Sequence, residues 1–229
     1  YKRQHPAPLF SPQLFSCSSF RVGLLGNSFA RIGSGSMPFL IPLLLQVALG
    51  YGALQAGLML LPVALAGMAV KRCATPLIRS QGYRRVLVGN TLLLGLLIAS
   101  FTLLGPTTPL ALKLALLMVF GAVNSLQFTA MNTVTLKDLP DGDASSGNSM
   151  LSMVQMLAMT LGVTVAAALL STFEPWLSLP GESTSLAVFH ATFVCIGLMT
   201  AFSAWIFWQL PADRQAERHT KLHGDLPLD

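Results

Sequence analysis

The segment from Phe20 to Val47 is a long apolar run with Arg21 at its start and one further arginine, Arg31, near its middle. An apolar run of roughly 20 residues is long enough for a helix to cross a bilayer. A charge inside such a helix is costly and usually faces a bundle interior or a water-filled cavity. Arg31 lies eleven residues after Phe20, roughly 16 Å along the helix axis. That is far for a side chain to reach the membrane surface, so the sequence favours an interior role for Arg31 over a snorkelling arginine in a small-residue packing seam.

Five further apolar segments follow the first one, and only 10% of the chain is charged, against about 25% in a typical soluble domain. One such segment could be the core helix of a soluble protein, but six in a row could not. The sequence therefore predicts an all-α integral membrane protein with a linker at 1–19, a six-helix transmembrane bundle at 20–210 and a tail at 211–229. The later segments are Leu54–Val70, Val86–Leu104, Leu110–Val134, Met150–Phe173 and Leu186–Leu210.

The net charge of +5 is unevenly distributed along the chain. Lysine and arginine occupy the two ends and alternate connections, whereas the connections 50–53, 105–109 and 174–185 contain neither. This pattern is typical of membrane proteins whose basic loops stay in the cytoplasm. It predicts that both ends are cytoplasmic and that the basic clusters lie beside anionic lipid headgroups rather than nucleic acid.

Polar side chains lie on one face of the first, fourth and fifth segments when these are drawn as helices. Buried amides either hydrogen-bond neighbouring helices or contact a ligand, and the sequence leaves both open. Lys113 is expected either in the cavity or at the outer interface, and the third segment is expected to be peripheral with little polar chemistry. The predicted cavity-lining residues are Asn27, Arg31, Ser34, Asn124, Gln127, Asn148, Ser152 and Gln155.

No pattern in the chain predicts catalysis, a metal site or a cofactor. The sequence contains no HExxH or GxSxG motif, and its histidines are isolated at positions 5, 190, 219 and 223. The three cysteines have no metal-ligand or disulfide spacing. An enzymatic function is therefore not expected.

The stretch QAGLMLLPVALAGMAVKRCATPLIRSQGYRRVLVGN resembles the eighth-helix region and following loop of major facilitator drug:proton antiporters. The similarity is to the 14-helix EmrB/QacA branch, and it extends collinearly through ARIGSGSMPFLIPLLLQ and MNTVTLKDLPDGDASSGNSMLSM. The resemblance implies the C-terminal six helices of such a transporter, built from two inverted three-helix units. It also implies a bacterial inner-membrane location, a small-molecule substrate, protons, and N-terminal helices of the same transporter as partners.

Two features depart from the family pattern. The gating-loop motif is present as RSQGYRR, in which Gly82, Arg84 and Arg85 match but Arg79 replaces the acidic residue. The role of that acid in gating therefore does not carry over. Every Asp and Glu is expected in a connection or at an end of the chain, so proton coupling is implied by the resemblance alone.

The leading hypothesis from the sequence is a secondary active exporter that couples multidrug efflux to protons by alternating access. Arg31 would then pair with a carboxylate in the missing half and keep it ionised until protonation or substrate breaks the pair. The alternatives are an organic-anion exporter in which Arg31 and Lys113 contact the substrate, and a six-helix membrane scaffold that transports nothing.

Overall fold

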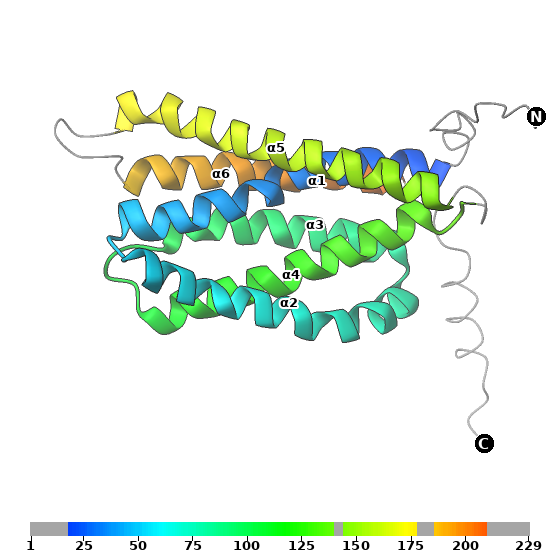
Figure 1. The fold of residues 1–229 in the computed structure, drawn as a ribbon, viewed down its shortest axis with the longest axis horizontal. Helices are drawn as coiled ribbons and strands as arrows, with labels where there is room; N and C mark the ends of the chain where they lie inside the picture. Colours follow the sequence, from blue (N-terminus) through cyan, green and yellow to red (C-terminus); the bar gives the residue numbers. More distant parts are fainter. Residues whose placement is uncertain (1–17, 140–143, 178–185, 210–229) are drawn as a thin grey trace, which may run out of the picture.

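The computed structural model describes residues 18–139, 144–177 and 186–209. Within them six helical segments are long and apolar enough to cross a membrane, and these run side by side along the long axis of the molecule (Figure 1). The all-α, six-span prediction is confirmed. The helices are α1 (Ser18–Leu43), α2 (Ala53–Gln81), α3 (Tyr83–Ser100), α4 (Leu110–Leu136), α5 (Ala144–Leu177), α6 (Leu186–Phe202) and the short α7 (Ala204–Trp208). The predicted linker, apart from 18–19, and the predicted tail at 211–229 lie outside the described residues.

Two helices are longer than their apolar runs. Helix α2 continues beyond Val70 to Gln81, through the segment predicted to be a loop, and α3 starts directly after Gly82. Gly82 makes this one-residue joint possible because its φ of 80° is one that side chains rarely tolerate. Helix α5 continues to Leu177, so Glu174, expected in a connection, lies near the helical end.

The first span becomes irregular only near its end. The Gly-Ser segment 33–36 stays within α1, and the helix changes only after Pro42, where a π-helix follows at Leu44–Ala48. The carbonyl of Leu44 accepts a hydrogen bond from the N–H of Leu49 at 3.0 Å, five residues on. Proline has no N–H to donate, which loosens the regular ladder at this point.

Glycine allows the most extensively packed helix pairs, α1 with α5, α2 with α4 and α3 with α6, to approach backbone to backbone. A Cβ on Gly162 of α5 would lie 2.3 Å from the carbonyl oxygen of Ile32 in α1. A Cβ on Gly121 of α4 would lie 2.3 Å from the carbonyl oxygen of Val63 in α2. Such close approach supplies the dispersion contacts that hold helices together in lipid, where burial of apolar surface does not.

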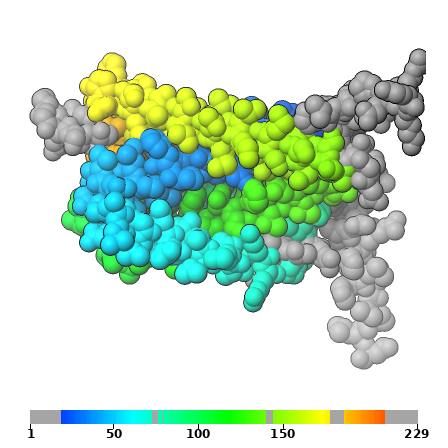
Figure 2. Space-filling view, in the orientation of Figure 1, coloured from blue at the N-terminus to red at the C-terminus, as the bar shows by residue number. Residues whose placement is uncertain are grey.

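The helix pairing has the symmetry of two inverted three-helix units. Exchanging α1 with α4, α2 with α5 and α3 with α6 converts the α1–α5 pair into the α4–α2 pair and leaves the α3–α6 pair unchanged. Helices α5, α1, α4 and α2 are exposed on the face shown in Figure 2, with α3 and most of α6 behind them.

The third helix differs from its prediction. Helix α3 packs against both α6 and α4, and its Asn90 and Thr91 are buried and hydrogen-bonded to a side chain of α4. The expectation of little polar chemistry in this helix is wrong, because two polar residues in a mostly apolar run are enough to bond α3 to Gln127 of α4.

We expect Gly162→Ala to destabilise the bundle, because the new methyl group would overlap the backbone of α1. The loss should be about 1–3 kcal/mol, the usual range for overpacking, and is measured as a lower melting temperature of the purified full-length transporter. The control is Gly89→Ala in α3, where an added Cβ meets nothing within 4 Å. Equal melting temperatures for the two variants would contradict the close-packing explanation.

Candidate functional site

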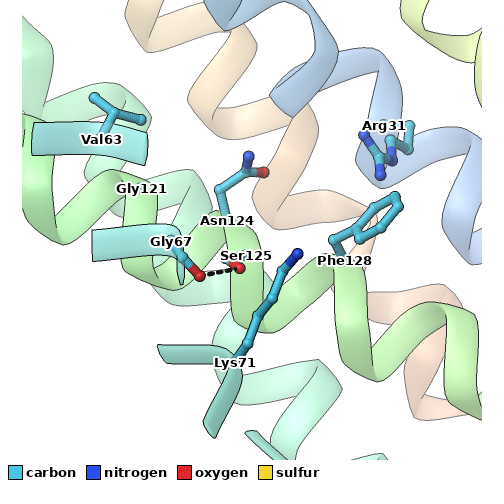
Figure 3. Close-up of a pocket in the computed structure, with 8 residues that line it drawn as sticks. All are labelled: Arg31, Val63, Gly67, Lys71, Gly121, Asn124, Ser125 and Phe128. Carbon is cyan, nitrogen blue, oxygen red and sulfur yellow. Dashed lines mark hydrogen bonds between the residues drawn. The ribbon is translucent and has the colours of Figure 1, made fainter. Parts of the chain in front are cut away.

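An open hollow of about 310 Å³ lies between α1, α2 and α4 (Figure 3). Helix α1 contributes one cationic side chain, α2 contributes a second, and α4 supplies polar and aromatic groups. The lining residues are Arg31, Val63, Gly67, Lys71, Gly121, Asn124, Ser125 and Phe128.

Helical spacing accounts for this lining. Val63, Gly67 and Lys71 follow one another at intervals of four, which places them along one face of α2. The α4 residues stand at positions 121, 124, 125 and 128, which also lie on one side of a helix. The hydroxyl of Ser125 donates a 2.7 Å hydrogen bond to the carbonyl oxygen of Gly67, which ties α4 to α2 at the floor of the hollow (Figure 3).

Arg31 is half-buried at the side of the hollow. Its guanidinium carbon lies 4.2 Å from the centroid of the Phe128 ring, close enough for a cation–π interaction. Its one hydrogen bond in the described part of the chain is weak, from Nη1 to the sulfur of Met159 at 3.9 Å. No carboxylate in that part of the chain contacts Arg31.

Lys71 is the feature of the hollow that sequence reasoning missed. The apolar run ends at Val70, so Lys71 was interpreted as a loop residue that anchors the topology. Because α2 continues to Gln81, the side chain instead projects from a regular helix, and it extends toward Phe128 and Asn124 (Figure 3). The spacing of Val63, Gly67 and Lys71 is the signal that could have found it.

Gln127 lies outside the hollow, although it was grouped with Asn124. Its Nε2 donates to the hydroxyl of Thr91 at 2.6 Å, and its Oε1 accepts a 2.7 Å bond from Nδ2 of Asn90. The side chain is only 2% exposed. Residues three apart differ by about 60° around a helix, enough for Asn124 to face the hollow while Gln127 faces α3. This placement favours the helix-bonding interpretation of Gln127.

A second amide cluster joins α1, α4 and α5. Oδ1 of Asn132 accepts hydrogen bonds from Nε2 of Gln155 at 2.6 Å and from Nδ2 of Asn27 at 3.4 Å. Asn27 is fully buried, and its Oδ1 has no hydrogen-bond partner among the described residues. Asn27 and Gln155 therefore both bond to Asn132. Both were predicted to line the cavity, but neither is among the residues that line the hollow.

The remaining predicted residues do not line the hollow. Ser34 is buried in α1. The hydroxyl of Ser152 donates to the carbonyl oxygen of Asn148, which is exposed on α5. Contact of these residues with a substrate stays a prediction.

Lys113 lies near the start of α4 and does not line the hollow. It is 2% exposed, and its Nζ lies 3.0 Å from the hydroxyl of Tyr51 and 5.1 Å from the centroid of that ring. It is eleven residues from Asn124 on α4, a rise of roughly 16 Å. Lys113 therefore lies away from the hollow that Arg31 lines.

The residues of the predicted gating loop surround the α2–α3 joint. The guanidinium of Arg84 lies 4.9 Å from the Trp208 ring, and Arg85 is exposed. Gly82 forms the joint itself, and the side chain of Arg79 lies outside the described residues. A gating role for these residues stays a prediction.

A metal site is not evident in the described ranges. No three His, Cys, Asp or Glu side chains gather there closely enough to hold a metal ion. The hollow instead offers charge, amide groups and an aromatic ring, which are means of binding rather than of catalysis.

Comparison with known proteins finds one matching family model and relatives that cover most of the chain. The model of the Major Facilitator Superfamily matches residues 2–163. Proteins named "Putative multidrug resistance protein MdtD" from Salmonella typhimurium and Salmonella typhi are each 44% identical to the chain over 218 residues. The alignments cover 94% of this chain but 46% of each relative, so the chain spans about half the length of these relatives.

The different placement of the two α4 amides predicts different consequences of their removal. Gln127→Leu removes two hydrogen bonds to α3 and should lower the stability of the full-length transporter by about 1 kcal/mol, without changing ligand affinity. Asn124→Leu should weaken ligand binding and leave the melting temperature nearly unchanged. Thermal unfolding and equilibrium binding on the same preparations measure both, and the reverse pattern would contradict the assignment.

Proposed function

The chain belongs to the major facilitator superfamily, and on that premise we propose that it is the C-terminal half of a proton-coupled exporter of drug-like small molecules. It is a multi-pass membrane protein, and members of this family are transporters rather than enzymes. The name of the relatives, "Putative multidrug resistance protein MdtD", supports drug-like compounds as the substrate class.

The observation that carries the proposal is Arg31, an interior cation with no carboxylate contact among the described residues. A charge in a membrane interior is costly and usually pairs with another charge or faces a watery cavity, so a carboxylate from the opposite half would stabilise Arg31. Three of the four helices exposed on the face in Figure 2 line its hollow. In transporters of inverted-repeat architecture, substrate and coupling sites lie near the bilayer midplane between repeats.

Proton coupling would follow if the opposite half supplies a carboxylate to Arg31. A neighbouring cation favours the ionised form of a carboxylate. Entry of a substrate that separates the two groups would favour protonation, and return of the pair would release the proton. Alternating access of the two halves then exposes the carboxylate to each side of the membrane in turn.

The distribution of charge supports an inner-membrane orientation with both ends of this segment in the cytoplasm. The end of α2, the start of α3 and the end of α4 lie at the same end of the bundle (Figure 1). Basic side chains gather there at Arg84, Arg85 and Lys137. Such residues are retained on the cytoplasmic side during insertion.

We expect Arg31→Gln in the full-length transporter to reduce drug-induced proton movement at least about tenfold, because the charge that sets the carboxylate's protonation is gone. The measurement is collapse of a pH gradient in everted membrane vesicles, with a lipophilic cation and an organic anion each tested as the added drug. Arg21→Gln, which removes an exposed cation from the same helix, is the control. Coupled efflux at the parental rate in Arg31→Gln vesicles of equal expression would overturn the proposal.

A further inference from the structure

We propose that Arg31 and Lys71 together bind the carboxylate of an amphipathic organic anion, whose apolar body lies in the hollow beside Phe128. This inference rests on the proposed transport function and names the substrate class of the same site. It assigns Lys71 a role in ligand binding, which nothing in its position just after the apolar run suggests.

The charge of the hollow is the first argument. Arg31 and Lys71 reach it from different helices, and no aspartate or glutamate is among the residues that line it. Two cations facing one cavity repel each other, and this repulsion is stronger where protein and lipid exclude water. A single bound anion lowers the energy of both. The hollow is therefore matched in charge to a negatively charged ligand.

The donors of the two side chains form the second argument. A guanidinium has five N–H donors in its plane, and only one of those on Arg31 has an acceptor in the described part of the chain, the weak thioether of Met159. The contact with Phe128 involves the ring face and leaves the donors available. The Lys71 ammonium extends into the same space (Figure 3). A carboxylate has two oxygens, so one can accept from each cation.

The walls of the hollow define the rest of the ligand. The side chain of Asn124 projects into the space (Figure 3), where it can hydrogen-bond a polar group. The Ser125 hydroxyl already donates to Gly67. Val63 and Phe128 offer apolar surface, and a volume of about 310 Å³ lies at the lower end of the range for small-molecule pockets. A carboxylate attached to one or two aromatic rings meets these conditions.

Counting charges separates this inference from simple pairing with the opposite half. One carboxylate supplied by that half would neutralise one of the two cations and leave a positive charge in the hollow. A cationic drug would be repelled by the remaining charge, whereas an organic anion would be attracted. The simpler alternative is that Lys71 only anchors α2 beside lipid headgroups. Replacing Lys71 would then leave ligand affinity unchanged.

The test is equilibrium binding of matched naphthalene ligands to the purified full-length transporter. Naphthoate carries the carboxylate, naphthamide is its neutral isostere, and naphthylmethylammonium is the cation. We expect naphthoate to bind at least about tenfold more tightly than naphthamide, because charge-assisted hydrogen bonds are about twice as strong as neutral ones. The naphthylmethylammonium ligand should bind weakest of the three.

Variants then assign the effect to the two residues. Lys71→Gln and Arg31→Gln should each weaken naphthoate binding about tenfold or more and leave naphthamide binding nearly unchanged. Lys71→Arg should retain the preference for the carboxylate. Arg72→Gln, which removes an exposed cation next to Lys71 that does not line the hollow, is the matched control and should behave as the parent. Melting temperatures verify that each variant is folded.

Equal affinity for naphthoate and naphthamide, or a folded Lys71→Gln variant with parental naphthoate affinity, would overturn the inference. These outcomes are distinguishable from failure of the proposed function. Lys71-dependent naphthoate binding without any transport in vesicles would leave the site standing and overturn the exporter. Coupled efflux of cations without a preference for naphthoate would do the opposite.

Discussion

Backbone contact at glycine is the interaction on which the bundle depends. Moving an apolar side chain from lipid into a helix interface changes its free energy little. Helices therefore associate where they can approach closely enough for dispersion and hydrogen bonding. Gly162 against Ile32 and Gly121 against Val63 give this approach to two helix pairs, and Gly95 and Gly197 meet at the α3–α6 pair behind them. The hollow is a consequence of this arrangement. Where Gly67 and Gly121 bring α2 and α4 together, the neighbouring surface of α1 leaves a space that Arg31 borders.

Polar contacts add specificity to these glycine contacts. The Gln127 network fixes α4 on α3, and the cluster centred on Asn132 fixes α4 on α1 and α5. Helix α4 is therefore held on several sides while its remaining face is free to carry Asn124 and Phe128 into the hollow. The same helix thus provides both structural and candidate binding groups, separated by only a fraction of a turn.

The sequence was sufficient to predict the six spans, because long apolar runs are a strong constraint. It was not sufficient for Lys71 or Gln127. Hydropathy marks where a segment leaves the apolar phase, not where its backbone hydrogen bonds stop, so α2 was predicted to end at Val70 although it continues to Gln81. A helical wheel groups Asn124 with Gln127, but the helix that each faces depends on tertiary packing. The position of Lys113 against Tyr51 likewise depends on a contact between distant segments.

The single-residue joint at Gly82 has a mechanical consequence. Helices α2 and α3 have no slack between them, so a tilt of α2 cannot be absorbed by a flexible connection and must displace the start of α3. Arg84, stacked on Trp208, lies in that first turn. Helix α2 thus connects Lys71 in the hollow with the Arg84–Trp208 contact beyond its end. Movement of α2 would be transmitted from the hollow to that contact.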